Sequence, residues 1–167
     1  MATFLFAGCT AYLPRYALPV GAAPTGFNED PNRPDLALLE YRLARYFVQQ
    51  QLPYPTVCAV GNKLDLVKEE SQPLALDPQV EQALLARFSG LSPASRCKRE
   101  GLRIVDRETG VAAAVFNVHD LDCDTATKCS AWAGYYGAGP HGWSWYWLTW
   151  DGREWRIRRR EMDIVLT

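Results

Sequence analysis

The C-terminal stretch, residues 143–160, constrains the fold more than any other part of this chain. Asp151 and Gly152 at its centre are typical of a two-residue hairpin turn, whose central residues both need positive φ angles. Side chains alternate between the two faces of a strand, so the position of the turn decides which residues share a face. The sequence therefore predicts a hairpin with one apolar face and one face of tryptophan and arginine.

Counting outward from this turn predicts which residues lie opposite each other across the hairpin. On one face Leu148 is opposite Trp155 and Tyr146 is opposite Ile157, and we assign this face to the core. The other face, here named the Trp/Arg face, carries the six candidate binding residues, in the predicted pairs Trp147 with Arg156, Trp145 with Arg158 and Trp143 with Arg160. Rows of this kind can form cation–π contacts.

Length and composition indicate an ordinary globular domain. The chain has 167 residues, of which 48% are hydrophobic and 22% charged, enough for one domain with a sizeable core. A net charge of −1 gives no reason to expect a nucleic-acid partner. No apolar run approaches the roughly 20 residues that a membrane-spanning helix needs. Nothing in the composition predicts a cofactor or a metal.

The first of the five cysteines, Cys9, allows two interpretations. Small residues precede it, as in the cleavage box of bacterial lipoproteins, where this cysteine would carry the lipid. No Lys or Arg comes before it, and the apolar stretch is shorter than the roughly 7–15 residues of a signal core. A start codon placed too far downstream would explain both departures, and the protein would then lie in the periplasm or cell envelope, with Cys9 as its membrane anchor. An ordinary N-terminal strand or a buried cysteine is the other interpretation, which leaves the protein in the cytoplasm.

The other four cysteines are Cys58, Cys97, Cys123 and Cys129. Their even number fits disulfides in an oxidising compartment, and their spacing does not resemble a zinc site. We predict at least one disulfide among them. Cys123 can pair with Cys129, or both can pair with Cys58 and Cys97, and a free buried thiol is the remaining option.

The order of the expected elements predicts an α+β fold, with two helices packed on a curved antiparallel meander that ends in the Trp/Arg hairpin. Leucines at helical spacing predict a helix over residues 35–51. Asp77 and Pro78 begin a second helix, which Gly90 ends. Residues 55–60 are expected to form a short strand that leads into a polar loop, and residues 91–100 are expected to form another loop. From residue 102 onward the chain is expected to form strands joined by short connections, with a polar loop at residues 120–125.

Two parts of the chain are distinguished by this pattern. Residues 35–167 are predicted to form a single α+β domain. Residues 1–34 are expected to hold the lipoprotein-like start and, from residue 10, a Pro-rich arm that forms a tether or covers the domain.

Two polar clusters are candidates for chemistry. Asp120, Asp122 and Asp124 alternate as at the start of a calcium-binding EF-hand loop, but the later positions of that loop lack the required Gly and Glu. His119 and His141, together with Asp120 or Asp122, could form a general base with its orienting carboxylate, although no nucleophile accompanies them. Exposed loop residues are the simpler interpretation of both clusters.

Several short motifs occur in order along the chain: Pro55-Thr56-Val57-Cys58, Asp77-Pro78, Ser95-Arg96-Cys97, Val105-Asp106-Arg107-Glu108-Thr109-Gly110, Ala133-Gly134-Tyr135-Tyr136 and Gly152-Arg153-Glu154-Trp155-Arg156-Ile157. In their order and spacing, the chain from about Thr56 onward resembles a loose group of small bacterial proteins that are often expected to be secreted or lipid-anchored. Its ending also resembles the curved sheet of nuclear-transport-factor-like or cystatin-like α+β folds. The resemblance implies a fold and an export route and no catalytic residues.

Two functional hypotheses follow. In the first, the chain is a non-enzymatic bacterial envelope protein that binds a protein partner through the Trp/Arg face, as an immunity or inhibitor protein would. In the second, it binds or converts a small molecule in a cone-shaped fold, with a pocket between helix 35–51 and the sheet. The Trp/Arg face itself has three interpretations: it is covered by residues 10–34, it lines a cavity, or it is the partner surface.

Overall fold

The computed structural model describes residues 26–49, 54–65, 68, 71–137 and 141–166, with Gln49, His141 and residues 160–166 described by their backbone alone. Cys9 and most of the expected arm lie outside the described residues, so the lipid-anchor hypothesis stays a prediction.

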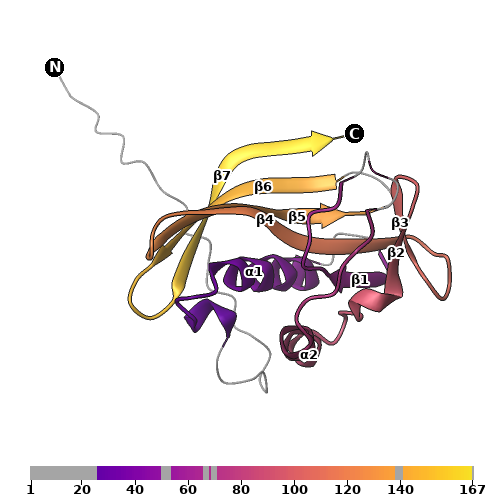
Figure 1. Cartoon of the computed structure of the whole chain (residues 1–167), viewed down its shortest axis with the longest axis horizontal. Helices are drawn as coiled ribbons and strands as arrows, with labels where there is room; N and C mark the ends of the chain where they lie inside the picture. Colours follow the sequence, from indigo (N-terminus) through magenta and orange to yellow (C-terminus); the bar gives the residue numbers. More distant parts are fainter. Residues whose placement is uncertain (1–25, 50–53, 66–67, 69–70, 138–140, 167) are drawn as a thin grey trace.

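The described chain is an α+β fold, as predicted, built on a curled five-stranded sheet (Figure 1). The strands in spatial order are β1 (Thr56–Ala59), β4 (Ala113–Thr125), β5 (Lys128–Tyr136), β6 (His141–Trp150) and β7 (Trp155–Leu166). The antiparallel meander of β4 to β7 is confirmed. The sheet as a whole is mixed and mostly antiparallel, because β1 runs parallel to β4. A long excursion through a helix and two further strands separates β1 from β4, and such a crossover allows parallel pairing.

The predicted first helix is confirmed as α1 (Pro34–Gln49), which lies across one face of the sheet (Figure 1). Its buried residues include Leu36, Leu39 and Leu43. These side chains pack against Phe116 of β4 and Tyr135 of β5 in one apolar cluster. The periodic pattern of apolar residues therefore identifies both the helix and the face that it buries.

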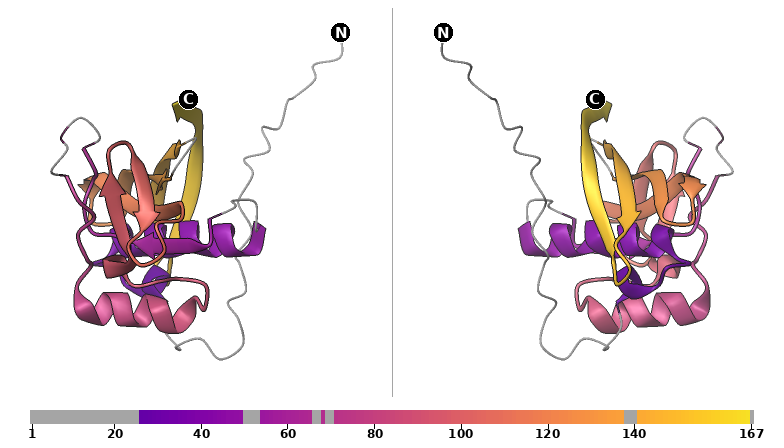
Figure 2. Two further views of the ribbon diagram at one scale, coloured as in Figure 1. Left: turned by 90° about the vertical axis from the view of Figure 1, so that its right-hand side faces the viewer. Right: turned by 90° about the vertical axis from the view of Figure 1, so that its left-hand side faces the viewer.

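The second helix is α2 (Pro78–Arg87), which lies on the far side of α1 from the sheet (Figures 1 and 2). The Asp77 carboxylate accepts a hydrogen bond from the backbone N–H of Gln79 at 2.9 Å and caps the helix, as predicted. Buried Val80 and Leu84 join the cluster beneath α1. A buried ion pair also ties the two helices, with 2.5 Å between a guanidinium nitrogen of Arg87 and a carboxylate oxygen of Glu40.

A small second sheet covers one end of the opposite face of the main sheet (Figure 2). It consists of β2 (Cys97–Glu100) and β3 (Arg103–Asp106), and β2 follows the short 3-10 helix η2 (Ala94–Arg96). Residues 91–100 were expected to form a loop, and this expectation is wrong for β2. The sequence signal of β2 is weak because three of its four residues, Lys98, Arg99 and Glu100, are charged, while its antiparallel partner supplies the pairing.

Strand β4 is longer than predicted, because residues 120–125 continue the strand where a polar loop was expected. The chain bulges between His119 and Asp122, and Asp120 takes a positive φ of 52° there. Beyond the bulge, Cys123 pairs with Cys129 of β5. Cross-strand pairing therefore overrides the low strand propensity of the aspartates.

The described end of the expected arm packs against the C-terminal hairpin. It includes the 3-10 helix η1 (Phe27–Glu29). The indole N–H of Trp155 donates to the backbone oxygen of Asp30 at 2.8 Å, and the amide of Asn28 donates to Glu154 at 3.2 Å. Trp155 belongs to the cluster that faces α1. The described residues of the arm therefore support the core side of the hairpin and not the Trp/Arg face.

Candidate functional site

The turn of the C-terminal hairpin differs from its prediction. Trp150 pairs with Trp155, which leaves four residues, 151–154, between the strands instead of two. The Asp151 carboxylate accepts hydrogen bonds from the backbone N–H groups of Arg153 and Glu154, both at 3.0 Å. These bonds form an Asx-type turn, which competes with the two-residue turn that an Asp followed by Gly favours.

The longer turn moves each partner on β7 two residues further along the strand. The predicted cross-strand pairs are therefore wrong, while the predicted division of the hairpin into a core face and an opposite face is correct. Leu148 lies opposite Ile157, and Trp147 lies opposite Arg158. A shift of two residues keeps every side chain on its face, because the side-chain period of a strand is two. Tyr146, Leu148 and Trp155 are buried in the cluster against α1, which confirms the assignment of the core face.

The opposite face carries two rows of side chains across β5, β6 and β7. The paired residues of one row are Ser130, Trp147 and Arg158, and those of the next are Lys128, Thr149 and Arg156. Trp147 stands at the centre of its row with 44% of its surface exposed. A large apolar side chain this exposed, between polar neighbours, is typical of a contact surface.

The other tryptophans of the Trp/Arg face lie elsewhere than predicted. Trp145 packs on Trp132 of β5, with 5.2 Å between the ring centres, and does not pair with Arg158. Trp143 pairs with Ile164 because the strands lose their regular register between Ser144 and Tyr146. Trp143 is buried at one end of the face, 4.7 Å from the ring of Tyr136. The side chain of Arg160 lies outside the described part of the chain.

A groove of about 490 Å³ opens at the exposed end of this face. We name it the Trp147 groove, and the polar and aromatic side chains that line it include Asp124, Lys128, Ser130, Trp147, Arg156 and Arg158. Trp147, Arg156 and Arg158 were predicted as binding residues, whereas Asp124, Lys128 and Ser130 were not. Strand alternation places Lys128 and Ser130 on one face of β5, but only the pairing of β5 with β6 shows which face that is.

The charges of the Trp147 groove are unequally neutralised. Arg156 contacts Asp151 at 2.6 Å and Glu154 at 2.7 Å. The turn's backbone N–H groups and Arg156 lower the pKa of Asp151 to about 2, so this carboxylate is ionised at neutral pH. Lys128 and Arg158 form no ion pair with any residue that the structure describes. These two cations therefore stand at the groove without a described carboxylate partner.

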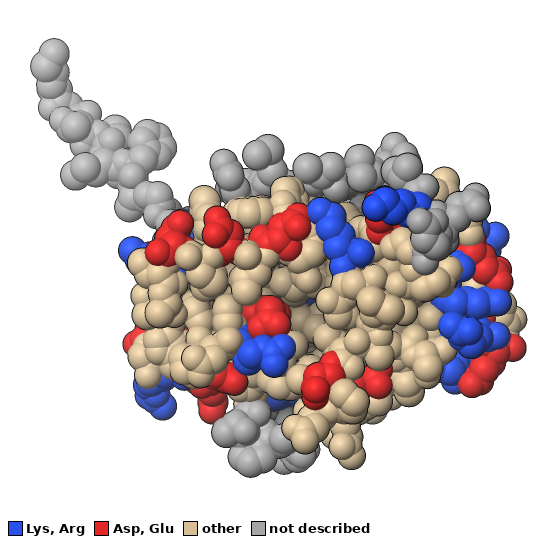
Figure 3. All heavy atoms as spheres, in the orientation of Figure 1, with Lys and Arg blue, Asp and Glu red and all other residues tan. Residues whose placement is uncertain are grey.

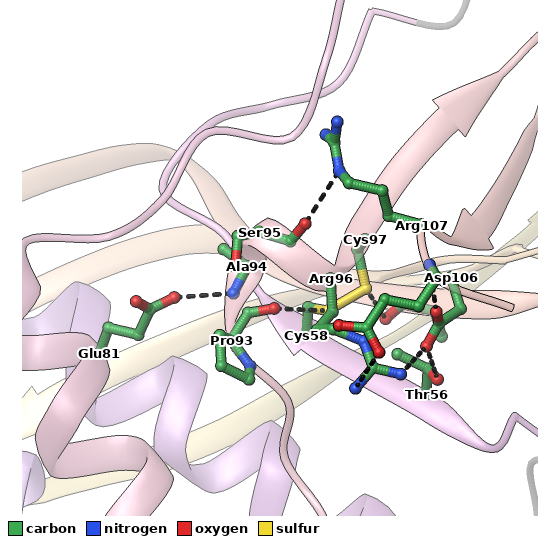
Figure 4. Close-up of a disulfide and its surroundings, with 12 residues drawn as sticks. Thr56, Cys58, Glu81, Pro93, Ala94, Ser95, Arg96, Cys97, Asp106 and Arg107 are labelled. Atoms are coloured by element: carbon green, nitrogen blue, oxygen red, sulfur yellow. Dashed lines mark hydrogen bonds and ion pairs between the residues drawn. A yellow bond between two sulfur atoms is a disulfide. The ribbon is translucent and has the colours of Figure 1, made fainter.

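The four described cysteines form two disulfides, Cys58–Cys97 and Cys123–Cys129. This confirms the prediction of at least one disulfide and decides between the pairings that the sequence left open. The first joins β1 to β2 within the core (Figure 4), and the second joins β4 to β5 at the edge of the Trp147 groove. Both fit a protein of an oxidising compartment outside the cytoplasm. Among the described helices, none has the length and apolarity to cross a membrane.

The core disulfide lies beside a buried carboxylate, that of Asp106 (Figure 4). This carboxylate accepts hydrogen bonds from the Thr56 hydroxyl at 2.5 Å and from Arg96 at 2.6 Å, and also from the backbone N–H groups of Glu108 and Thr109. These donors, the Thr56 hydroxyl first, hold the pKa of Asp106 well below its usual range. Residues from three of the sequence motifs meet at this junction. Both oxygens of the Asp106 carboxylate already accept hydrogen bonds from within the protein, so we assign the junction a structural role.

Comparisons with known protein families, characterised proteins and solved structures find no match for this chain. Its function therefore has to follow from the geometry of its own surfaces and clusters.

The structure brings His119 and Asp120 together, with 2.9 Å between the imidazole Nδ1 and a carboxylate oxygen. His119 is half-buried, and its ring contacts the ring of Trp143 with 4.7 Å between the ring centres, so it is not the exposed loop residue that was expected. Burial lowers the pKa of His119, and Lys63 shares the Asp120 carboxylate at 2.8 Å. The nearby cysteines of β4 and β5 are disulfide-bonded and supply no thiolate.

Two further observations concern the interior of the fold and its polar clusters. The space between α1 and the sheet, where the second hypothesis places a pocket, is filled by buried side chains such as Leu39, Leu43 and Phe116. In the described part of the chain, no cluster of three His, Cys, Asp or Glu residues could hold a metal ion.

Proposed function

We propose that this chain is an exported, non-enzymatic binding protein that holds a protein partner in the Trp147 groove. Trp147 carries this proposal, because it is exposed at the centre of a paired row with Arg158 beside it. Tryptophan and arginine dominate the energetic hot spots of protein interfaces. The groove lies on a rigid three-strand platform, so its side chains need little ordering when a partner binds.

Two further observations support export and binding. Both disulfides suit an oxidising compartment, which favours the periplasm or cell envelope over the cytoplasm. The side chains that surround α1 form a filled core, so the ligand surface is the opposite face of the sheet. An immunity or inhibitor protein fits these features, since it acts by occupying a partner and needs no catalytic residues.

Titration with the proteins encoded beside this chain tests the proposal, because immunity proteins are encoded next to their toxins. Each neighbour is purified and titrated calorimetrically with the full chain and with Trp147→Ala. We expect one neighbour to bind and Trp147→Ala to weaken that binding at least about tenfold.

Leu102→Ala provides the matched control. Leu102 is 67% exposed and lies at the turn between β2 and β3, outside the Trp147 groove. An affinity unchanged in Trp147→Ala, or lowered equally in Leu102→Ala, would show that the partner binds elsewhere.

A further inference from the structure

The cations of the Trp147 groove lie on either side of its tryptophan. Lys128 is on β5 and Arg158 is on β7, with Trp147 on β6 between those strands. Neighbouring strands are about 4.8 Å apart and residues two apart on a strand about 7 Å, so this diagonal spans roughly 12 Å between Cα atoms. A ligand with an apolar centre and an acidic group at each end matches this arrangement.

Several basic side chains elsewhere on the molecule form ion pairs with carboxylates. In Figure 3, the basic side chains at the right-hand end, where Figure 1 places β2 and β3, stand beside acidic ones. Lys98 contacts Glu100 at 2.6 Å, and Arg96 contacts Asp106 at 2.6 Å. Lys128 and Arg158 lack such a partner among the described residues, although the whole chain has a net charge of −1. Their charge is therefore available to a ligand.

Resting on the proposed function, we infer that the partner contributes an extended acidic segment, in which an apolar side chain lies between two acidic ones. Alternate residues of an extended segment point the same way, and residues four apart are about 13 Å apart. An acidic–x–apolar–x–acidic segment therefore places its carboxylates near Lys128 and Arg158 while its central side chain packs on Trp147. Ser130 and Thr149, beside Trp147 in the two rows, offer hydroxyl groups to the backbone of the segment.

Fluorescence anisotropy with defined peptides tests this inference on the full, disulfide-bonded chain. The probe is a labelled nine-residue peptide, Glu-Thr-Leu-Thr-Glu-Thr-Leu-Thr-Glu, and its matched control has lysine at every glutamate. We expect the acidic peptide to bind at least ten times more tightly than the lysine peptide, and its affinity to fall at least threefold when NaCl is raised from 50 to 300 mM.

Variants assign the binding to the groove. Lys128→Glu and Arg158→Glu are expected to weaken binding of the acidic peptide at least tenfold each, and both sites are exposed, so the fold is retained. Arg103→Glu is the control, since Arg103 is exposed on β3 away from the groove. Equal affinity for the two peptides, or an equal loss in Arg103→Glu, would overturn the inference.

Two further arms separate this inference from other outcomes. Phosphatidylglycerol vesicles that compete fully with the acidic peptide would identify a membrane surface as the occupant and overturn it. A neighbour-encoded partner whose binding is lost in Trp147→Ala but unchanged in Lys128→Glu and Arg158→Glu would also overturn it, while the proposed function would stand. If Trp147→Ala, Lys128→Glu and Arg158→Glu all leave the binding of that partner unchanged, the proposed function itself fails.

Discussion

Trp147 of β6 lies directly opposite Arg158 of β7, two residues further along β7 than a two-residue turn predicts. The Asx-type turn at Asp151 sets this pairing, while the alternation of side chains keeps both residues on the open face. The neighbouring pair, on the other face, buries Leu148 opposite Ile157. One hairpin therefore supplies both a core strand pair and the binding groove, and the two faces should respond differently to mutation.

The two faces of the hairpin are distinguished by stability measurements. Trp155 is 4% exposed, and its indole N–H is hydrogen-bonded to Asp30, so Trp155→Ala should lower the free energy of unfolding by about 3–5 kcal/mol. Trp147→Ala removes a side chain that is 44% exposed and should cost only about 0.5 kcal/mol. Urea unfolding of both variants measures the difference. Equal large losses would show that the face around Trp147 is covered.

The two disulfides should contribute unequally to stability. Cys58–Cys97 closes a separation of 39 residues and Cys123–Cys129 one of 6, for which loop-closure entropy predicts about 4 and about 2 kcal/mol. Replacing each pair by alanines and unfolding the variants in urea measures the two contributions. A smaller loss from the Cys58/Cys97 variant than from the Cys123/Cys129 variant would contradict this order.

The buried ion pair of Glu40 and Arg87 predicts a characteristic mutational pattern. Arg87→Met leaves the buried carboxylate of Glu40 without its partner and should cost about 3–5 kcal/mol at pH 7. The double variant Glu40→Leu with Arg87→Met removes both charges and should recover most of that loss. Thermal unfolding of the three proteins provides the comparison, and a double variant no more stable than Arg87→Met would contradict it.

The stability that Arg87→Met loses relative to the native chain should depend on pH in a defined direction. Burial raises the pKa of Glu40 in the folded protein, so the folded state binds a proton more readily than the unfolded state does. A group whose pKa is higher in the folded state than in the unfolded state stabilises the fold at low pH, and this stabilisation is lost as the pH rises through the folded-state pKa. Removing Arg87 raises the pKa further, so Arg87→Met should approach the stability of the native chain as pH falls from 7 to 5. A constant difference across this range would show that Glu40 stays ionised.

Acid should act on Asp106 in the opposite direction. Its lowered pKa gives stability that is present above the unfolded pKa of an aspartate and lost as pH falls toward the folded value. Asp106→Asn should therefore be less stable than the native chain at pH 7, and the difference should shrink between pH 5 and pH 3. Urea unfolding across this range measures it, with Asp124→Asn as an exposed control. If the stability difference between Asp106→Asn and the native chain does not change with pH, the negative charge of Asp106 does not contribute to stability.

The sequence by itself determined the α+β class, both helices and the core face of the hairpin. These features depend on local information: the leucine spacing of α1, the Asp77 cap of α2 and the alternation around Leu148. The core face was correct even though the turn was misjudged, because an error of two residues preserves side-chain alternation.

Only the tertiary structure decided which distant residues meet. Cysteine spacing could not select Cys58–Cys97, since the contact depends on how β2 packs beside β1. The parallel pairing of β1 with β4 follows from a long crossover, and the place of Lys128 beside Trp147 follows from the pairing of β5 with β6. Local periodicity predicts which face of each element is buried. Strand order and register depend on long-range packing, and this packing brings the residues of the Trp147 groove together.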